Sequence, residues 1–419
     1  MSSARRRLQA VQNALMTVHK GTIPDGTNFL VLPDGKRVEM SGEPGTSDQH
    51  LLLDGEPVCL LRFSGRTAVL TLSGLGTPHE HTASHIPHYP VLEVHVVRTS
   101  DQRINLPDMW TIVYALFTKY HEQETIPIVL SAYITNGADL RSYILRSGLG
   151  RVSPSPDISQ EYLFLMRATF WQGAGQAGFH ERGWLPPSDF SSYALSPFPF
   201  VQSFTRTPLV IAAHPLRPPK PKQGEVLYKR YCPTVGQTLD FTYFDLGSGE
   251  GVSAHLEAFH RWHNDERVSK GWNEAGSLQK HVEYVKGVLN DPSVLPIMMS
   301  WDGELMGYAE IVWLKENHVA AYIPNGAKDW DRGMHVLVGE EKFRGSDRAQ
   351  AWFRSILHYY FLADPRTERA IGEPRADNAA IVKVCLDASM HIETIFDFPY
   401  KRSAMTCVSR ERFFKMDVL

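Results

Sequence analysis

The spacing of apolar residues along the chain alternates between a strand pattern and a helix pattern. Between residues 28 and 75, short apolar runs are separated by turn signals such as Ser64-Gly65, which predicts an antiparallel β meander. The next segments predict a strand, a helix and a buried strand, over 91–97, 109–122 and 126–134. The first part of the chain is therefore predicted to be a mixed α/β domain.

The later part of the chain shows the same element types in a more regular order. Strand patterns over 226–246, two helical patterns and a hairpin that turns at Asp302-Gly303 lead into alternating strands and helices over 331–402. Before them, the run HPLRPPKPKQGE is rich in proline and basic residues, which suits an extended linker. We predict an N-terminal domain, a linker and a C-terminal α/β domain, over 1–213, 214–225 and 226–419.

Composition narrows the function classes. The 419 residues are 43% hydrophobic and 21% charged, as in ordinary globular proteins, and 43 basic against 46 acidic side chains argue against general nucleic-acid binding. No apolar run of membrane-spanning length occurs, so we expect no membrane partner. The four cysteines show no metal-binding spacing, which favours reduced thiols and a cytoplasmic location. A peroxisomal location is less favoured, because the N-terminal signal pattern lacks its Gln or His at Ala14.

One stretch near the C-terminus carries candidate chemistry. Arg344, Gly345 and Arg348 lie in a turn that opens a helix, and backbone N–H groups with arginines at a helix N-terminus form an anion site suited to a pyrophosphate. His335 and Asp377 fall at the ends of the two flanking strands. Their side chains are expected to converge on whatever the anion site holds.

Several blocks between about residues 255 and 415 resemble, in this order, the Gcn5-related N-acetyltransferases (GNAT). The pattern is most similar to the siderophore acyltransferases that acylate a hydroxylated ornithine or lysine. The blocks are Arg261-Trp262, Trp272 to Ser277, Trp301-Asp302-Gly303, Gly307 to Glu310, Asp331 to His335, Phe343-Arg344-Gly345, Asp364 to Thr367, Glu373 to Asn378 and Phe398 to Arg402.

This resemblance implies a GNAT-like fold for the C-terminal domain and an enzyme that is an N-acyltransferase. It implies transfer of an acyl group from acyl-CoA to N5-hydroxyornithine, forming a hydroxamate for siderophore biosynthesis, with acyl-CoA as co-substrate, no permanently bound cofactor and no metal. We favour acetyl as the acyl group, with a longer group such as that of anhydromevalonyl-CoA as the alternative. The N-terminal domain is considered as a second, degenerate GNAT-like unit. The choice between ornithine and lysine, and the oligomeric state, stay open.

The resemblance also implies roles for single residues. His335 is the expected general base, and Asp377 is expected to bind the substrate ammonium or orient His335, unless it only caps the following helix. Expected contacts with the cofactor come from Arg344, Gly345, Arg348, Lys401 and Arg402. Expected contacts with the acceptor come from Trp262, Asn264, Trp272, Asn273, Glu274 and Asn378.

Two positions depart from the general GNAT pattern. Asp347 stands where the anion turn has a glycine, and Cys385 stands where a tyrosine acid is common, so no acid for the leaving thiolate is assigned. One alternative is therefore a catalytically silent, CoA-binding regulatory protein. The other is a metal-dependent hydrolase built on the histidines at 79, 81, 85 and 88, although their spacing matches no zinc motif.

Overall fold

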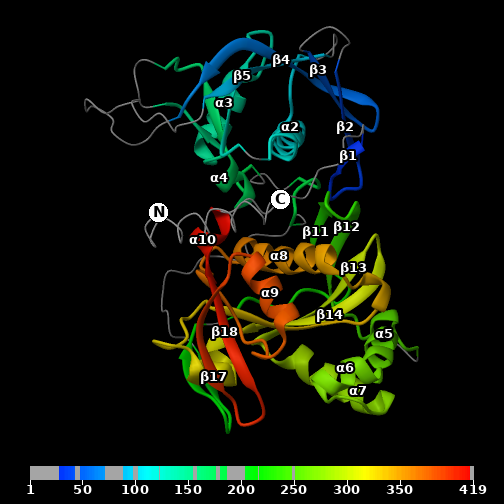
Figure 1. Ribbon diagram of the computed structural model, residues 1–419. Coiled ribbons are helices and arrows are strands. Elements are labelled where there is room, and N and C mark those ends of the chain that lie inside the picture. The colour runs from blue at the N-terminus through cyan, green and yellow to red at the C-terminus, as the bar shows by residue number, and fades with distance from the viewer. Residues whose placement is uncertain are drawn as a thin grey trace, which may run out of the picture. The chain divides into compact units, whose positions relative to one another are not determined.

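The computed structural model describes residues 28–42, 48–70, 88–97, 102–121, 123–153, 158–175, 180–185, 203–215, 217–247 and 251–415. Contacts divide the chain into two compact units, with the described residues up to 185 in the first and those from 203 in the second (Figure 1). The predicted linker segment is attached to the second unit, because Arg217 binds both carboxylate oxygens of Glu316 and lies over the Trp313 ring.

The first unit is built on one mixed sheet. Its strand order is β1-β2-β3-β4-β5-β6-β8-β7, antiparallel except for the parallel pair β5–β6, which helix α2 connects. The strands are β1 (Asn28–Val31), β2 (Arg37–Gly42), β3 (Gln49–Leu53), β4 (Glu56–Ala68), β5 (Tyr89–His95), β6 (Thr125–Leu130), β7 (Gly150–Arg151) and β8 (Leu163–Met166). The helices are α2 (Leu106–Lys119), α3 (Gly137–Arg146) and α4 (Arg167–Trp171).

The predicted β meander is confirmed with one difference. Ser64-Gly65 does not turn the chain back. It lies inside β4, where the pairing with β5 shifts register between Phe63 and Thr67 and Gly65 takes a φ of 72°. A glycine with positive φ inside a long strand marks a bulge, and the same residue pair is also a turn signal, which explains the wrong prediction.

The second unit also contains one mixed sheet, in the order β11-β12-β13-β14-β15-β16-β18-β17. Its strands are β11 (Val226–Cys232), β12 (Gln237–Tyr243), β13 (Val294–Trp301), β14 (Glu304–Trp313), β15 (Arg332–Val338), β16 (Arg369–Gly372), β17 (His391–Asp397) and β18 (Arg402–Ser409). Its helices are α5 (Ala254–His263), α6 (Glu266–Trp272), α7 (Leu278–Asn290), α8 (Ser346–Ala363), α9 (Ala379–Asp387) and α10 (Arg410–Phe414). A separate hairpin pairs β9 (Ser203–Arg206) with β10 (Ile211–His214).

The two sheets share one topology. In each sheet, a run of antiparallel strands is followed by a parallel pair of strands that a long helix connects. The last two strands form a hairpin, and the second of them pairs with the parallel strands while the first lies at the edge of the sheet. Helices α5, α6 and α7 have no counterpart among the described residues of the first unit. This repeated strand order supports the interpretation of the N-terminal domain as a GNAT-like unit.

The two crossover helices begin differently. Asn105 caps α2, its side chain accepting the Asp108 N–H, and a proline follows in the first turn. In contrast, Gly345 precedes α8 with a φ of 127° and no side chain caps that helix. Among the described residues, the first turn of α8 therefore keeps its N–H groups uncapped, whereas a cap and a proline reduce the number at α2.

Helices cover both faces of the second sheet. Helices α5, α6 and α7 pack on one face around Phe259, Trp262, Tyr308 and Leu337. His335 points to the same face as Leu337, because alternate residues of a strand share a side. Met334 and Val336 therefore point to the opposite face of the sheet. Helices α8 and α9 cover that face (Figure 1).

The pairing of β15 with β16 is short. These parallel strands are in register at Arg332 and Ala370, and no further pair along them is recorded among the described residues. They diverge beyond that point, toward His335 on one strand and Glu373 at the end of the other. The sheet therefore has a gap in its middle.

No described helix is both long enough and apolar enough to span a membrane.

Candidate active site

A cavity of about 440 Å³ lies at the gap between β15 and β16. Its lining residues run from Gly271 to Lys401, so the cavity belongs wholly to the second unit. Trp272, Glu274, Tyr284, Glu310 and His335 line it toward α6 and α7, whereas Met334, Phe353, Leu357, Ile381, Cys385 and Met390 line it toward α8 and α9. One end is therefore polar and the other apolar.

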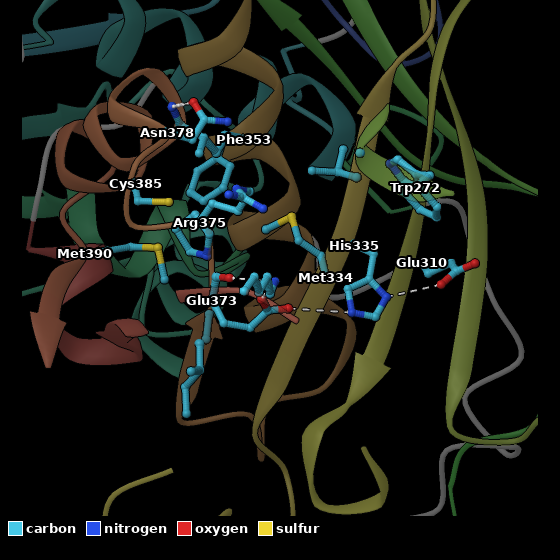
Figure 2. A pocket seen from close by; sticks show the side chains of 18 of the residues that line it. Trp272, Glu310, Met334, His335, Phe353, Glu373, Arg375, Asn378, Cys385 and Met390 are labelled. Carbon is cyan, nitrogen blue, oxygen red and sulfur yellow. Dashed lines mark hydrogen bonds and ion pairs between the residues drawn. The ribbon is translucent and has the colours of Figure 1, made fainter. Parts of the chain in front are cut away.

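His335 and Glu310 form the centre of the polar end. They are partners across the antiparallel strands β15 and β14, and His335 Nδ1–H donates to Glu310 Oε2 over 3.2 Å (Figure 2). The His335 side chain is about one third exposed, whereas Glu310 is buried. This contact holds the imidazole with Nδ1 toward the carboxylate and leaves Nε2 toward the cavity.

Two tyrosines hold Glu310 in turn. Tyr284 OH donates to Glu310 Oε1 over 2.5 Å, and Tyr308 OH donates to the same oxygen over 3.0 Å. Burial alone raises the pKa of Glu310, but the hydrogen bonds from His335 and both tyrosines outweigh it and keep that pKa below its usual value. The Glu310 carboxylate is therefore charged, and its hydrogen bonds hold the His335 ring in one orientation.

A second carboxylate faces the other imidazole nitrogen. Glu373 Oε1 lies 3.7 Å from His335 Nε2 (Figure 2). Glu373 Oε2 forms an ion pair with Lys401. Burial lowers the pKa of His335, but the hydrogen bond and charge of Glu310 and the charge of Glu373 prevail, so the net shift is upward. A histidine so tuned takes up a proton readily, as a general base must.

The predicted anion site is open at the start of α8. A Cβ added at Gly345 would meet nothing within 4 Å, and the Arg344 side chain is about half exposed beside Glu341. Arg348 donates to Gln237 and lies over the Phe343 ring, which fixes its guanidinium. These residues fit a pyrophosphate at the N-terminus of α8, the helix that further along lines the apolar end of the cavity.

The structure brings several predicted site residues together. His335, Trp272, Glu274, Asn378 and Lys401 all line the cavity. Trp272 meets the His335 ring edge to face, with centroids 6.4 Å apart. Lys401 forms an ion pair with Glu373 in the cavity lining, and its expected contact with the cofactor stays a prediction.

Other predicted residues have structural partners instead. Trp262 is buried in the core, donates to Glu340 and packs so closely on Gly339 that a Cβ there would lie 2.1 Å from its ring. Asn264 exchanges hydrogen bonds with Gly276 in both directions, and Asn273 ends α6 in the left-handed conformation. Asn264 and Asn273 therefore shape the loop that carries Glu274, and Trp262 is a core residue.

Asp377 and Arg402 lie outside the cavity lining. Asp377 is 70% exposed and forms a two-bond ion pair with Arg375, and neither its cap role nor a contact with His335 is seen. Asn378 caps α9, because its side chain accepts the Ile381 N–H. Arg402 is mostly exposed, 4.0 Å from Asp397. Glu310 and Glu373 take the place beside His335 that was expected for Asp377.

Sequence reasoning missed these two carboxylates. Both stand in the blocks that carry the family resemblance, and a charged residue in the apolar strand around Ile311 is itself a signal, because unpaired carboxylates are rarely buried. The cavity also contains His318 and Tyr400, whose side chains meet over 3.0 Å. Neither residue was predicted as part of the site.

The predicted metal alternative finds no support in the described part of the chain. No group of three or more His, Cys, Asp or Glu side chains there is placed to hold a metal ion. His79, His81 and His85 lie outside the described residues, so the structure says nothing about that loop.

A gapped sheet, an open helix N-terminus and a histidine oriented by a carboxylate define an acyltransferase of the GNAT type. The family model described as an acetyltransferase (GNAT) domain matches residues 251–398. The acyltransferase ato1 of Omphalotus olearius is 36% identical over 392 residues, which cover 93% of this chain and 95% of that protein. The chain therefore belongs to this acyltransferase family, as its sequence blocks predicted.

Two further relatives have more specific names. The N(5)-hydroxyornithine:cis-anhydromevalonyl coenzyme A-N(5)-transacylase SIDF of Beauveria bassiana is 37% identical, covering 74% of this chain and 73% of its own length. The N(6)-hydroxylysine O-acetyltransferase of Escherichia coli is 37% identical over 200 residues, which cover 48% of this chain and 60% of that protein. Both names describe acyl transfer to a hydroxylated amino acid.

Proposed function

We propose that this protein transfers an acyl group from acyl-CoA to the hydroxylated side-chain nitrogen of N5-hydroxyornithine, forming a hydroxamate for siderophore biosynthesis. The observation that carries the proposal is the His335–Glu310 pair at the polar end of a cavity whose apolar end is lined by α8, the helix with the uncapped N-terminus. The names of the two relatives support the acceptor. Acetyl is the proposed acyl group, and the longer acyl named for the Beauveria bassiana relative is the alternative.

The donor and the acceptor are assigned to opposite ends of the cavity. The pantetheine arm of acyl-CoA would lie against Phe353, Leu357 and Met334, with the pyrophosphate at Arg344 and the α8 N–H groups. The acceptor would lie against Trp272 and Glu274. The thioester carbonyl and the attacking nitrogen then meet beside His335, in the gap of the sheet.

The reaction is a direct attack in a ternary complex. The hydroxylamine nitrogen, largely uncharged at neutral pH, bonds to the thioester carbon, and the C–S bond breaks as the tetrahedral intermediate collapses. His335 Nε2 accepts the proton that the nitrogen loses, while Glu310 balances the imidazolium charge. Backbone N–H groups of β15 that face the gap are proposed to hold the developing oxyanion. The thiolate of CoA leaves without an assigned acid.

Product mass spectrometry tests the proposal. Purified protein is incubated with N5-hydroxyornithine or N6-hydroxylysine and a panel of acyl-CoAs, with the His335→Ala variant as control. The expected result is an N-acylated hydroxamate from hydroxyornithine, strongest with acetyl-CoA and nearly absent with the variant. Binding of acyl-CoA without product from any hydroxylated amino acid would instead identify a silent, CoA-binding protein.

A further inference from the structure

Lys401 is a half-buried cation in the lining of the cavity, and the acyl-transfer chemistry gives it no role. It lies in the turn between β17 and β18, its side chain is only 20% exposed, and its partner Glu373 is 12% exposed. Its ammonium also donates to the Glu373 carbonyl and lies 5.3 Å from the centre of the Phe398 ring. These contacts hold the charge in one place before any substrate arrives.

Glu373 connects this lysine to the reaction centre. One of its oxygens faces His335 Nε2 at 3.7 Å, and the other binds Lys401. The Glu373 carboxylate therefore lies between the Lys401 ammonium and the His335 imidazole and contacts both of them. The side-chain nitrogen and the α-carboxylate of ornithine are roughly 6 Å apart when extended, from C–C bonds of about 1.5 Å. With a hydrogen bond at each end, a substrate of this length is long enough to reach from His335 to Lys401.

The charges in this part of the cavity match an amino acid. Lys401 and Glu373 form one pair of opposite charges, and an α-amino acid brings one carboxylate and one ammonium. Arg375, the next cation of the lining, is more than half exposed and already bound to Asp377. Lys401 is thus the better placed cation for an acceptor whose nitrogen lies at His335.

We propose that Lys401 recognises the α-carboxylate of the acceptor amino acid. The substrate carboxylate replaces Glu373 on the lysine ammonium, and Glu373 then receives the substrate α-ammonium. One ion pair becomes two, the total charge is unchanged, and no buried charge is left without a partner. The inference rests on the proposed function and adds a specificity determinant, since it separates amino acid acceptors from hydroxylated amines that lack a carboxylate.

Acceptor discrimination tests this assignment. N5-hydroxyornithine and N-hydroxyputrescine carry the same hydroxylamine, but the second has no carboxylate. Wild-type kcat/KM is expected to favour hydroxyornithine by about 10- to 100-fold, the worth of one charge-assisted contact. Lys401→Met is expected to remove most of this preference through the KM for hydroxyornithine, with the dissociation constant for acyl-CoA unchanged and with partial recovery in Lys401→Arg.

The matched control is Lys383→Met, an exposed lysine on α9 that pairs with Asp387. This variant should keep the wild-type preference. If Lys401→Met slows both acceptors equally, the lysine only neutralises Glu373 and the inference is overturned. If neither acceptor is acylated by the wild-type protein, the proposed function itself fails, which is a different result.

A second measurement needs no variant. The carboxamide of N5-hydroxyornithine keeps the ammonium and the hydroxylamine but carries no negative charge. Wild-type protein is expected to use it about 10- to 100-fold less well than the acid. Equal use of amide and acid would also overturn the assignment of Lys401.

Discussion

Glu310 and His335 are paired in register across two antiparallel strands, and their side chains meet over 3.2 Å on the face that carries α5, α6 and α7. Two paired strands, and no loop, therefore position the Glu310 carboxylate against the Nδ1 side of the proposed base His335. Because both residues sit on central strands of the sheet, their separation is fixed by backbone hydrogen bonds. The base is thus oriented before the substrates bind.

Replacing Glu310 should move the pH dependence of the reaction. In the wild-type protein the two carboxylates keep the pKa of His335 raised, so the active, uncharged imidazole accumulates only as the pH rises through that raised value. Glu310→Gln removes one of these charges, which lowers the pKa of His335. We expect the acid limb of the kcat profile to shift to lower pH, with a lower plateau.

The control for this experiment lies on the same strand. Glu304→Gln removes an exposed carboxylate of β14 that pairs with Lys342, and it should leave the profile in place. An acid limb that stays at the wild-type pH in Glu310→Gln would show that His335 is not the group whose titration limits the rate.

Removing the base itself should have the largest effect on turnover. His335→Ala is expected to lower kcat by roughly a hundredfold or more, the range for loss of a general base. Acyl-CoA affinity should change little, because the proposed pyrophosphate site at α8 is untouched. Steady-state kinetics and isothermal titration with CoA measure the two effects. His391→Ala, an exposed histidine at the start of β17, is the control.

The two carboxylates near the β16–α9 connection should differ in importance. Glu373 lines the cavity beside His335, whereas Asp377 is largely exposed and bound to Arg375. We expect Glu373→Gln to raise the KM for the acceptor or lower kcat by about tenfold or more, the worth of a charge-assisted contact. Asp377→Asn should have a clearly smaller effect. The reverse order would return Asp377 to the role that the sequence first indicated.

Arg344 should contribute to acyl-CoA binding by a modest amount. Its side chain is about half exposed, so solvent screens its charge, and we expect Arg344→Ala to cost about 1 kcal/mol of binding free energy. Calorimetric titration with CoA and with dephospho-CoA checks this value. A loss seen only with CoA would place Arg344 at the 3′-phosphate, and no loss with either ligand would move the cofactor away from α8.

The stability of the second unit should decrease in mild acid. His281 Nε2–H donates to the Glu274 carbonyl over 2.7 Å, so its Nδ1 must accept the His260 Nδ1–H, also over 2.7 Å. A further proton on His281 would break this pair, and burial, the main cause, lowers the pKa of His281. Stability is then present above the ordinary histidine value of 6.5 and is lost as the pH falls below it.

The melting temperature between pH 7 and pH 5 measures this effect. His281→Gln cannot take up the proton, so its melting temperature should fall less steeply over this range, even where it is lower throughout. His391→Gln, on an exposed position, should keep the wild-type slope. Equal slopes in all three proteins would mean that His281 is not the group that titrates.

The order of elements was readable from the sequence, because apolar periodicity is local. The strand patterns around Asp302-Gly303 and the helix after Gly345 are found where the pattern predicted them. The bulge at Ser64-Gly65 was not, since a turn and a bulge use the same residue types. Whether such a residue pair forms a turn or a bulge depends on whether the strand continues to pair with its neighbour, and the residues nearby in the sequence do not show this.

The site was only partly readable for the same reason. His335 was found from its place before the basic turn, but its partner Glu310 lies 25 positions earlier, and their register depends on how the intervening segment folds back. Trp262 was expected to contact the acceptor because the family resemblance places its segment over the acceptor site. In the structure it fills the space left by the missing side chain of Gly339. Close packing against a glycine has no signature in a single sequence.

A cavity that passes through a sheet keeps its two substrates on separate routes. In the arrangement proposed above, donor and acceptor enter at opposite ends of the gap between β15 and β16, and neither needs to pass the other to reach His335. A pocket open on only one face of the sheet would impose a fixed order of substrate binding. The proposed arrangement predicts a ternary complex that assembles in either order. Initial-rate plots should then intersect, and each product should compete with the substrate whose end of the cavity it shares.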